Sequence, residues 1–131
     1  MRSRRWFWLA GVLVCMGAVL LGVAYEMSFA IRGPVRWALG RAEFKAQMER
    51  LPEPPKGELK HLDWDGWGFA GMGTEVYLVF DPTDSLAGAA ASHRAEKVPG
   101  VPCRFDRARR LEKNWYAVVY FTDQSWSVCT Y

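Results

Sequence analysis

The chain has 131 residues, half of them hydrophobic, and a formal net charge of +3. This length leaves room for one small domain beyond a membrane segment and excludes a doubly wound nucleotide-binding sheet. The charge is unevenly divided, because residues 1–50 carry eight Lys/Arg and three Asp/Glu whereas residues 51–131 carry nine and eleven. The distal part is therefore mildly acidic, which argues against nucleic-acid binding.

An uncharged apolar run covers residues 6–25 and directly follows Arg2, Arg4 and Arg5. A helix of about 20 apolar residues spans about 30 Å, the thickness of a bilayer's hydrocarbon core. We therefore predict a basic cytoplasmic tail at 1–5 and a transmembrane signal anchor at 6–29. Because the basic residues are densest before the run, the rest of the chain is expected outside the cytoplasm. On the plan of a bacterial envelope protein, the chain is a single-pass inner-membrane protein with a periplasmic or extracellular C-terminal domain.

Two alternatives to this topology stay open. Small residues at 22–24 and 28–30 stand at the spacing that a signal peptidase reads, so the domain could instead be secreted after cleavage. Flanking charge favours the orientation only modestly, and an inverted anchor would place the domain in the cytosol.

A stripe of small residues recurs within the apolar run at intervals of four, three and four. Its members are Gly11, Cys15, Ala18 and Gly22. Small residues on one face allow membrane helices to pack closely. The stripe predicts either a homodimer or attachment to a membrane complex as an accessory subunit.

A second helix is predicted over residues 30–51. Pro34 is expected to break or kink the preceding helix and to stand in the first turn of the new one. Trp37, Phe44, Met48 and Leu51 fall on one face of this helix, and basic residues occupy much of the remainder. This juxtamembrane amphipathic helix either lies on anionic lipid or a partner helix, or docks its apolar stripe on its own domain. A proline-rich spacer at 52–57 then precedes an extracytoplasmic domain at 58–131.

The domain reads as strands around one helix. Strands are predicted at 58–64, 74–81, 103–111, 115–121 and 126–130, the third and fourth forming a hairpin. A helix with Asp81 as its N-cap and Pro82 in its first turn is expected to end near His93. The fold class is therefore α+β: a transmembrane helix followed by a small, mostly antiparallel sheet (β-β-α-β-β-β) with one packed helix.

Two cysteines, Cys103 and Cys129, lie in the domain, and Cys15 lies in the apolar run. An even pair in an extracytoplasmic domain predicts a disulfide bond. Two free thiols are the alternative if the topology is inverted.

Catalytic signatures are missing from the sequence. Residues 66–71 match GxGxxG, but a strand follows them where a dinucleotide site needs a helix, so we predict a glycine-rich connector between strands. His61, Asp63 and Asp65 alternate as metal ligands might on a strand, yet the calcium-loop pattern fails after them. His93 and the serines show no triad spacing. We therefore expect no cofactor and no metal, and favour a protein that is not an enzyme, with a small hydrolase or metal-binding enzyme as the weaker alternative.

The candidate interaction surface consists of exposed charge and one loop tryptophan. Its residues are Trp67, Arg104, Arg107, Arg109 and Arg110. Clustered arginines can dock acidic partners, and exposed aromatic residues anchor interfaces. The alternative is an edge strand whose charges prevent sheets from pairing. The sequence thus favours a non-enzymatic interaction domain that binds an envelope protein or ligand.

Overall fold

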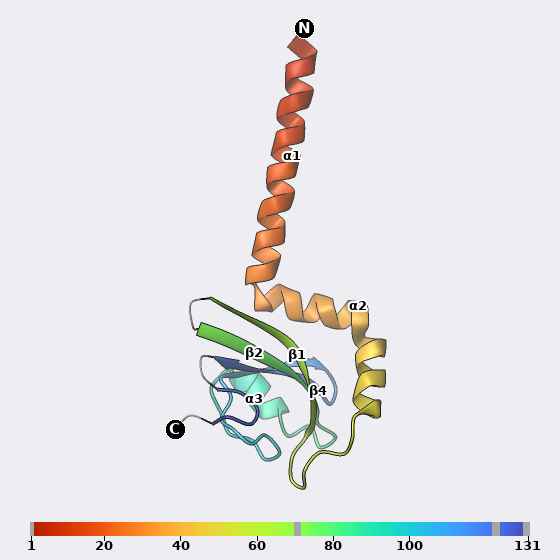
Figure 1. The fold of residues 1–131 in the computed structure, drawn as a ribbon, viewed down its shortest axis with the longest axis vertical. Helices are drawn as coiled ribbons and strands as arrows, with labels where there is room; N and C mark the ends of the chain where they lie inside the picture. The colour runs from red at the N-terminus through yellow and green to blue at the C-terminus, as the bar shows by residue number, and fades with distance from the viewer. Residues whose placement is uncertain (1, 70–71, 122–123, 130–131) are drawn as a thin grey trace. The chain divides into compact units, whose positions relative to one another are not determined.

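The structure is a computed structural model that describes residues 2–69, 72–121 and 124–129. These residues contain three helices and a four-stranded antiparallel sheet, which confirms the α+β prediction (Figure 1). The chain divides into two compact units, Met1–Gly40 and Arg41–Tyr131.

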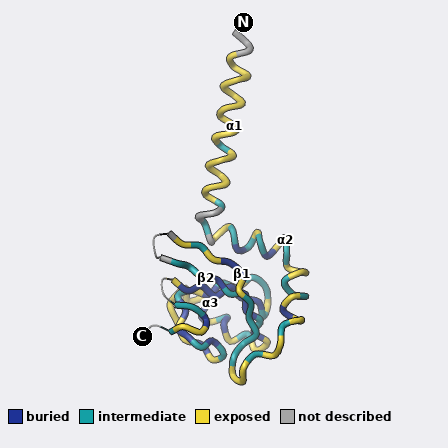
Figure 2. Tube along the Cα trace, viewed as in Figure 1, coloured by how far each residue is buried: buried dark blue, intermediate teal, exposed yellow. Residues whose placement is uncertain are grey.

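The first unit holds α1, Arg2–Met27, and the beginning of α2, Phe29–Arg50. Within α1, Arg5–Tyr25 is long and apolar enough to cross a membrane, and its side chains are almost all exposed (Figure 2). A secretory signal sequence meets the same criteria of length and composition. The helix break falls at Ser28, whose carbonyl accepts the Ile31 and Arg32 N–H groups, and Pro34 lies inside α2. The predicted break at Pro34 was therefore misplaced.

The sheet consists of β1 (Lys60–Phe69), β2 (Met72–Phe80), β3 (Arg107–Glu112) and β4 (Trp115–Phe121). The strand order is β1-β2-β4-β3, with every neighbouring pair antiparallel. Strand β4 therefore lies between β2 and β3, and all of its residues are buried except Phe121. Alternating apolar side chains on both faces of β2 and β4 explain why these two strands were found from sequence.

Strand β1 is longer than predicted, because it continues through the first glycines of the GxGxxG match. Gly66 pairs with Glu75, and a Cβ at Gly66 would lie 3.3 Å from the Thr74 carbonyl oxygen. Glycine therefore allows a close approach of two strand backbones here. The predicted glycine-rich connector over 66–71 was wrong for residues 66–69, and residues 70–71 lie outside the described part of the chain.

The predicted fifth strand at 126–130 is wrong over the residues that the structure describes. Residues 124–129 contain no strand, and Thr130 lies outside the described residues. The Ser125 N–H donates to the Val128 carbonyl across a turn, which diverts the backbone from sheet pairing. Side-chain contacts of Trp126 and the disulfide of Cys129 anchor this segment instead.

The third helix, α3, is shorter than expected and runs over Ala87–Ser92. Its N-cap position is Leu86, so Asp81 as the predicted N-cap was wrong by five residues. The Asp81 carboxylate organises the turn before the helix, where it accepts the Thr83 and Leu86 N–H groups. His93 ends α3 at the C-cap in a left-handed conformation, close to where the sequence placed the end.

The hydrophobic core lies on one face of the sheet, between β2 and β4 and the segment that contains α3 (Figure 2). Its members include Val79, Leu86, Ala89, Phe105, Tyr116, Val118, Tyr120 and Trp126. The C-terminal half of α2 packs on the opposite face of the sheet. There the Phe44 ring meets Trp64 edge-on at 5.8 Å between centroids, and the Lys45 ammonium lies 5.6 Å from the Trp115 ring centroid. This end of α2 therefore docks on its own domain.

Candidate interaction surface

Strand register brings two predicted parts of the interaction surface onto one face of the sheet. Trp67 pairs with Thr74, and Thr74 pairs with Phe121. Residues directly opposite one another in antiparallel strands share a face, so these three side chains form a row across β1, β2 and β4. The row belongs to the sheet face opposite the core.

Arg107 and Arg109 belong to the same face. Arg107 pairs with Val119, which is two residues from Phe121 and therefore points the same way. Phe121 is 39% exposed, Arg107 is exposed, and Trp67 and Arg109 are half-buried. We call the four residues Trp67, Phe121, Arg107 and Arg109 the Trp67–Arg107 surface. It combines aromatic area with positive charge, which suits a partner that carries carboxylates beside apolar groups.

The other two candidate arginines lie elsewhere. Arg110 follows Arg109 on β3 and points to the core face, where its Nη2 lies 3.4 Å from the Asp84 carboxylate. Arg104 precedes β3, is exposed, and donates to the Ala95 carbonyl at 3.4 Å. The five predicted residues are thus not one surface. Strand β3 is an edge of the sheet, so the protective-charge interpretation of its arginines also fits its position.

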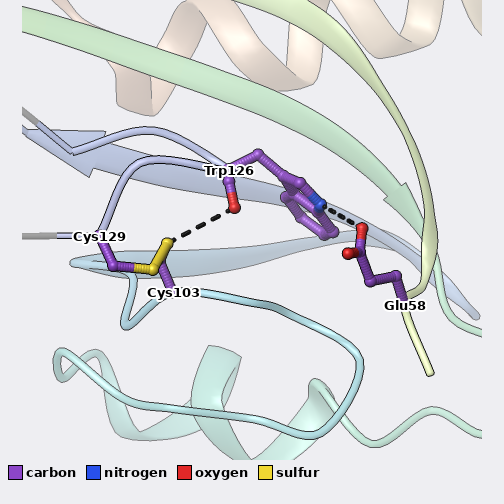
Figure 3. The surroundings of a disulfide bond; sticks show 4 residues. All are labelled: Glu58, Cys103, Trp126 and Cys129. Atoms are coloured by element: carbon purple, nitrogen blue, oxygen red, sulfur yellow. Dashed lines mark hydrogen bonds between the residues drawn. A yellow bond between two sulfur atoms is a disulfide. The ribbon is translucent and has the colours of Figure 1, made fainter. Parts of the chain in front are cut away.

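The disulfide joins Cys103 to Cys129, whose Cα atoms lie 5.2 Å apart (Figure 3). Between them in the chain, Trp126 is buried and its Nε1–H donates to the Glu58 carboxylate at 3.2 Å. The Trp126 ring stacks on His61 with centroids 3.9 Å apart. The C-terminal segment is therefore attached to the domain by one covalent bond and one buried aromatic side chain.

The two histidines lie in different parts of the domain, His61 on β1 and His93 at the end of α3. The Nδ1 of His61 lies 3.1 Å from the Leu59 carbonyl oxygen, an acceptor, so this nitrogen carries the proton. His93 is exposed at the helix end. The described residues include no group of three metal-ligating side chains. A bulge between Asp63 and Asp65 interrupts the alternation on which the metal hypothesis depended.

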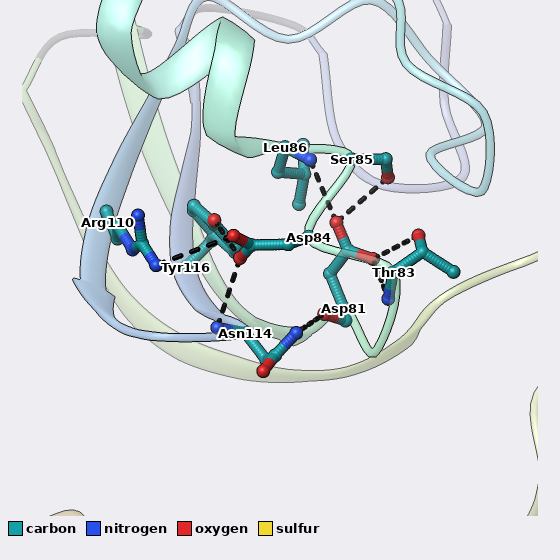
Figure 4. A network of polar contacts seen from close by, with 8 residues as sticks. All are labelled: Asp81, Thr83, Asp84, Ser85, Leu86, Arg110, Asn114 and Tyr116. Carbon is teal, nitrogen blue, oxygen red and sulfur yellow. Dashed lines mark hydrogen bonds and ion pairs between the residues drawn. The ribbon is translucent and has the colours of Figure 1, made fainter.

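A polar network that sequence reasoning missed joins the turn after β2 to the β3–β4 hairpin (Figure 4). Asp84 accepts a short hydrogen bond from the Tyr116 hydroxyl and a 3.2 Å bond from the Asn114 N–H. The Asn114 side chain donates in turn to the Asp81 carbonyl at 2.8 Å. Asp84 and Asn114 both have positive φ, a conformation that Asp and Asn tolerate better than most residues. The network is architectural, since it locks two turns together.

Both carboxylates of this network have lowered pKa values. For Asp84, the hydrogen bond from Tyr116 is the main cause of the lowered pKa. The Asn114 N–H and the charge of Arg110 lower the pKa further. Burial alone would raise the pKa of Asp81, but hydrogen bonds from Leu86, Thr83 and Ser85 more than offset it. Conversely, burial and the bond to Asp84 raise the pKa of Tyr116 to about 12.

We expect the domain to lose stability in acid through these two groups. An unfolded Asp has a pKa of about 3.9, and both folded-state values lie lower. The unfolded chain therefore binds more protons, so the stabilisation is present above about pH 4 and is lost as pH falls through the folded-state values. Asp84→Asn should destabilise the domain at pH 7. Between pH 5 and pH 2, the urea midpoint of this variant should decrease less than that of wild type. Asp63→Asn, on an exposed residue, is the matched control. Equal pH slopes for Asp84→Asn and wild type would contradict this assignment.

The chain matches no protein-family model, no curated protein and no solved structure.

Proposed function

We propose that this chain is a single-pass inner-membrane protein whose domain lies outside the cytoplasm and binds an envelope protein without catalysis. The observation that carries the proposal is the Trp67–Arg107 surface, on which strand register unites two aromatic and two basic side chains. Aromatic residues and arginine are the residue types most enriched at binding hot spots.

Two features support the proposed location of the domain outside the cytoplasm. Arg5–Tyr25 is apolar and long enough to serve as the anchor, and the arginines before it favour a cytoplasmic N-terminus. The domain beyond it contains the Cys103–Cys129 disulfide, a bond typical of oxidising compartments. Both the apolar helix and the disulfide therefore support a domain outside the cytoplasm.

The chemistry of the surface selects the class of partner. Arg107 and Arg109 are two residues apart on one strand face, about 7 Å along the strand, a spacing that suits two carboxylates of an extended chain. Trp67 and Phe121 lie on the same face, and the exposed part of Phe121, 39% of the residue, can contact an apolar side chain. We therefore infer that the ligand is an acidic segment of a protein, with aromatic or aliphatic residues beside its carboxylates.

The test is site-specific photocrosslinking in intact membranes. A photoreactive phenylalanine analogue at position 121 should capture a partner, and Arg107→Gln with Arg109→Gln should reduce capture at least tenfold, because two charge-assisted contacts are lost. Arg94→Gln with Lys56→Gln makes the same charge change at exposed positions elsewhere and should leave capture intact. Circular dichroism should show that both double variants fold.

Two outcomes would overturn the proposal. Undiminished capture by Arg107→Gln/Arg109→Gln would show that the surface is not the contact. Capture that survives this change but is lost in Ala18→Leu/Gly22→Leu would favour an accessory subunit held by the small-residue stripe of α1 instead.

A further inference from the structure

The two sulfur atoms of the disulfide have different environments. Cys103 is 1% exposed and belongs to the hydrophobic core, whereas Cys129 is half-buried and packs against that core from outside. A cavity of about 720 Å³ lies beside the bond and is lined in part by both cysteines and by Lys97, Arg104 and Asp106. Because Lys97 and Arg104 are exposed, this cavity reaches the protein surface. A molecule from solvent can therefore approach the disulfide on one side.

We propose that Cys129 is a site of thiol–disulfide exchange with a dithiol protein, and that this cavity admits the attacking thiolate. An attacking sulfur must approach along the S–S axis, behind the sulfur with which it bonds. Core packing around Cys103 blocks that approach at one end, while the half-buried Cys129 permits it at the other. The proposal goes beyond partner binding and does not depend on the Trp67–Arg107 surface.

The charges around the cavity favour an anionic attacker. Lys97 and Arg104 contribute two positive charges, and Asp106 contributes one negative charge. The Asp106 carboxylate also accepts a hydrogen bond from the Phe121 N–H at 2.8 Å, which partly compensates its negative charge. Thiolates are the reactive form of thiols and are stabilised beside Lys and Arg. The net positive lining thus raises the local concentration of the reactive species.

The exchange balances in two steps. A partner thiolate attacks the Cys129 sulfur and a mixed disulfide forms. The Cys103 sulfur leaves with the electron pair of the broken bond and takes a proton that reaches it from solvent through the cavity, which Cys103 also lines. The second thiol of the partner, deprotonated, then attacks the partner's sulfur in the mixed disulfide and releases Cys129 as a thiolate. The protein's disulfide gains two electrons, and the partner dithiol is oxidised to a disulfide. The reverse sequence installs the bond.

A hydrogen-bond acceptor for the displaced Cys103 sulfur is already present in the core. The Cys103 Sγ lies 3.5 Å from the Trp126 carbonyl oxygen, a contact without a proton while the disulfide is intact (Figure 3). Once protonated, the Cys103 thiol can donate to that oxygen without moving. The stack of Trp126 on His61 and its bond to Glu58 do not involve the sulfur atoms. Exchange can therefore proceed in the folded domain.

The test maps the attacked sulfur in the full-length wild-type protein in detergent micelles, with reduced glutathione as the probe thiol. After a short reaction and an acid quench, free thiols are alkylated with N-ethylmaleimide and the peptides are analysed by mass spectrometry. We expect glutathione on Cys129 and the alkyl group on Cys103. Glutathione mainly on Cys103, an equal division, or no mixed disulfide below the denaturant concentration that unfolds the domain would each overturn the proposal.

A charge-reversal pair tests the role of the cavity. Lys97→Glu should slow glutathione attack about threefold, as expected for two charge units at a screened distance of several ångströms. Lys56→Glu makes the same change at an exposed position that does not line the cavity, and its rate should equal that of wild type. Equal slowing by both variants would show that net charge alone governs the rate and would refute entry through this cavity.

Discussion

Replacing both Cys103 and Cys129 with serine lowers the free energy of unfolding of the domain by about 3.5 kcal/mol. The bond closes a loop with a sequence separation of 26, and the chain-entropy relation gives this value for a loop of that size. Small domains are stable by only about 5–15 kcal/mol, so the loss is a large share of the total. Urea unfolding at pH 7, followed by tryptophan fluorescence, measures the change as a lower midpoint.

Two controls separate this effect from others. Cys15→Ser changes the remaining cysteine, which is exposed on α1, and should leave the urea midpoint unchanged. Wild-type protein in excess dithiothreitol should unfold at the midpoint of the double serine variant, because both lack the bond. A free energy of unfolding that stays within about 0.5 kcal/mol of the wild-type value, the range of ordinary surface substitutions, would show that the disulfide adds little to stability.

The elements that sequence predicted well are those with a local signal. Strands β2 and β4 carry unbroken apolar alternation, and the apolar run of α1 is defined by composition alone. The pairing of Cys103 with Cys129 followed by elimination once the third cysteine was placed in α1. Each of these inferences needed only a few neighbouring residues or a count.

The elements that sequence missed depend on partners far along the chain. Asp81 was predicted as a helix N-cap but lies in the turn before α3. The partners of Asp81 and Asp84 in the network, Asn114 and Tyr116, lie about thirty residues away. A turn-forming Asn between two strands was the available signal, and it gives no indication of what the Asn side chain will bond. Likewise, Trp126 resembled a strand residue, yet its stack on His61 gives the segment an irregular path.

The candidate surface likewise combines a feature that is predictable from local sequence with one that depends on distant residues. Strand period alone separates Arg107 and Arg109 from Arg110, because alternate residues of a strand point to opposite faces. Placing Trp67 on the face of Arg107 additionally requires the order β1-β2-β4-β3, in which β3 lies beyond β4 at the edge. That order results from packing of the whole sheet, so no local pattern encodes it.

Asp81→Ala should destabilise the domain by about 3 kcal/mol, because a fully buried carboxylate that bonds three neighbouring residues is lost. Asp81 is 0% exposed and accepts from the Thr83 hydroxyl at 2.8 Å, the Ser85 hydroxyl at 2.9 Å and the Leu86 N–H at 2.8 Å. Alanine leaves the buried Leu86 N–H without its acceptor, and an unsatisfied buried donor costs about 1–3 kcal/mol in addition to the lost charge-assisted bonds.

The hydrogen bonds between the Asp81 backbone and Asn114 do not involve the carboxylate, so the substitution leaves them in place and its effect isolates the side chain. Asp63→Ala makes the same chemical change at an exposed position of β1 and should cost no more than about 0.5 kcal/mol. Urea unfolding of both variants at pH 7 gives the comparison. Because the Asp81 carboxylate stabilises the fold only while ionised, the difference between Asp81→Ala and wild type should also narrow as pH falls below about 4. Equal losses for Asp81→Ala and Asp63→Ala would mean that solvent can satisfy this turn without the carboxylate.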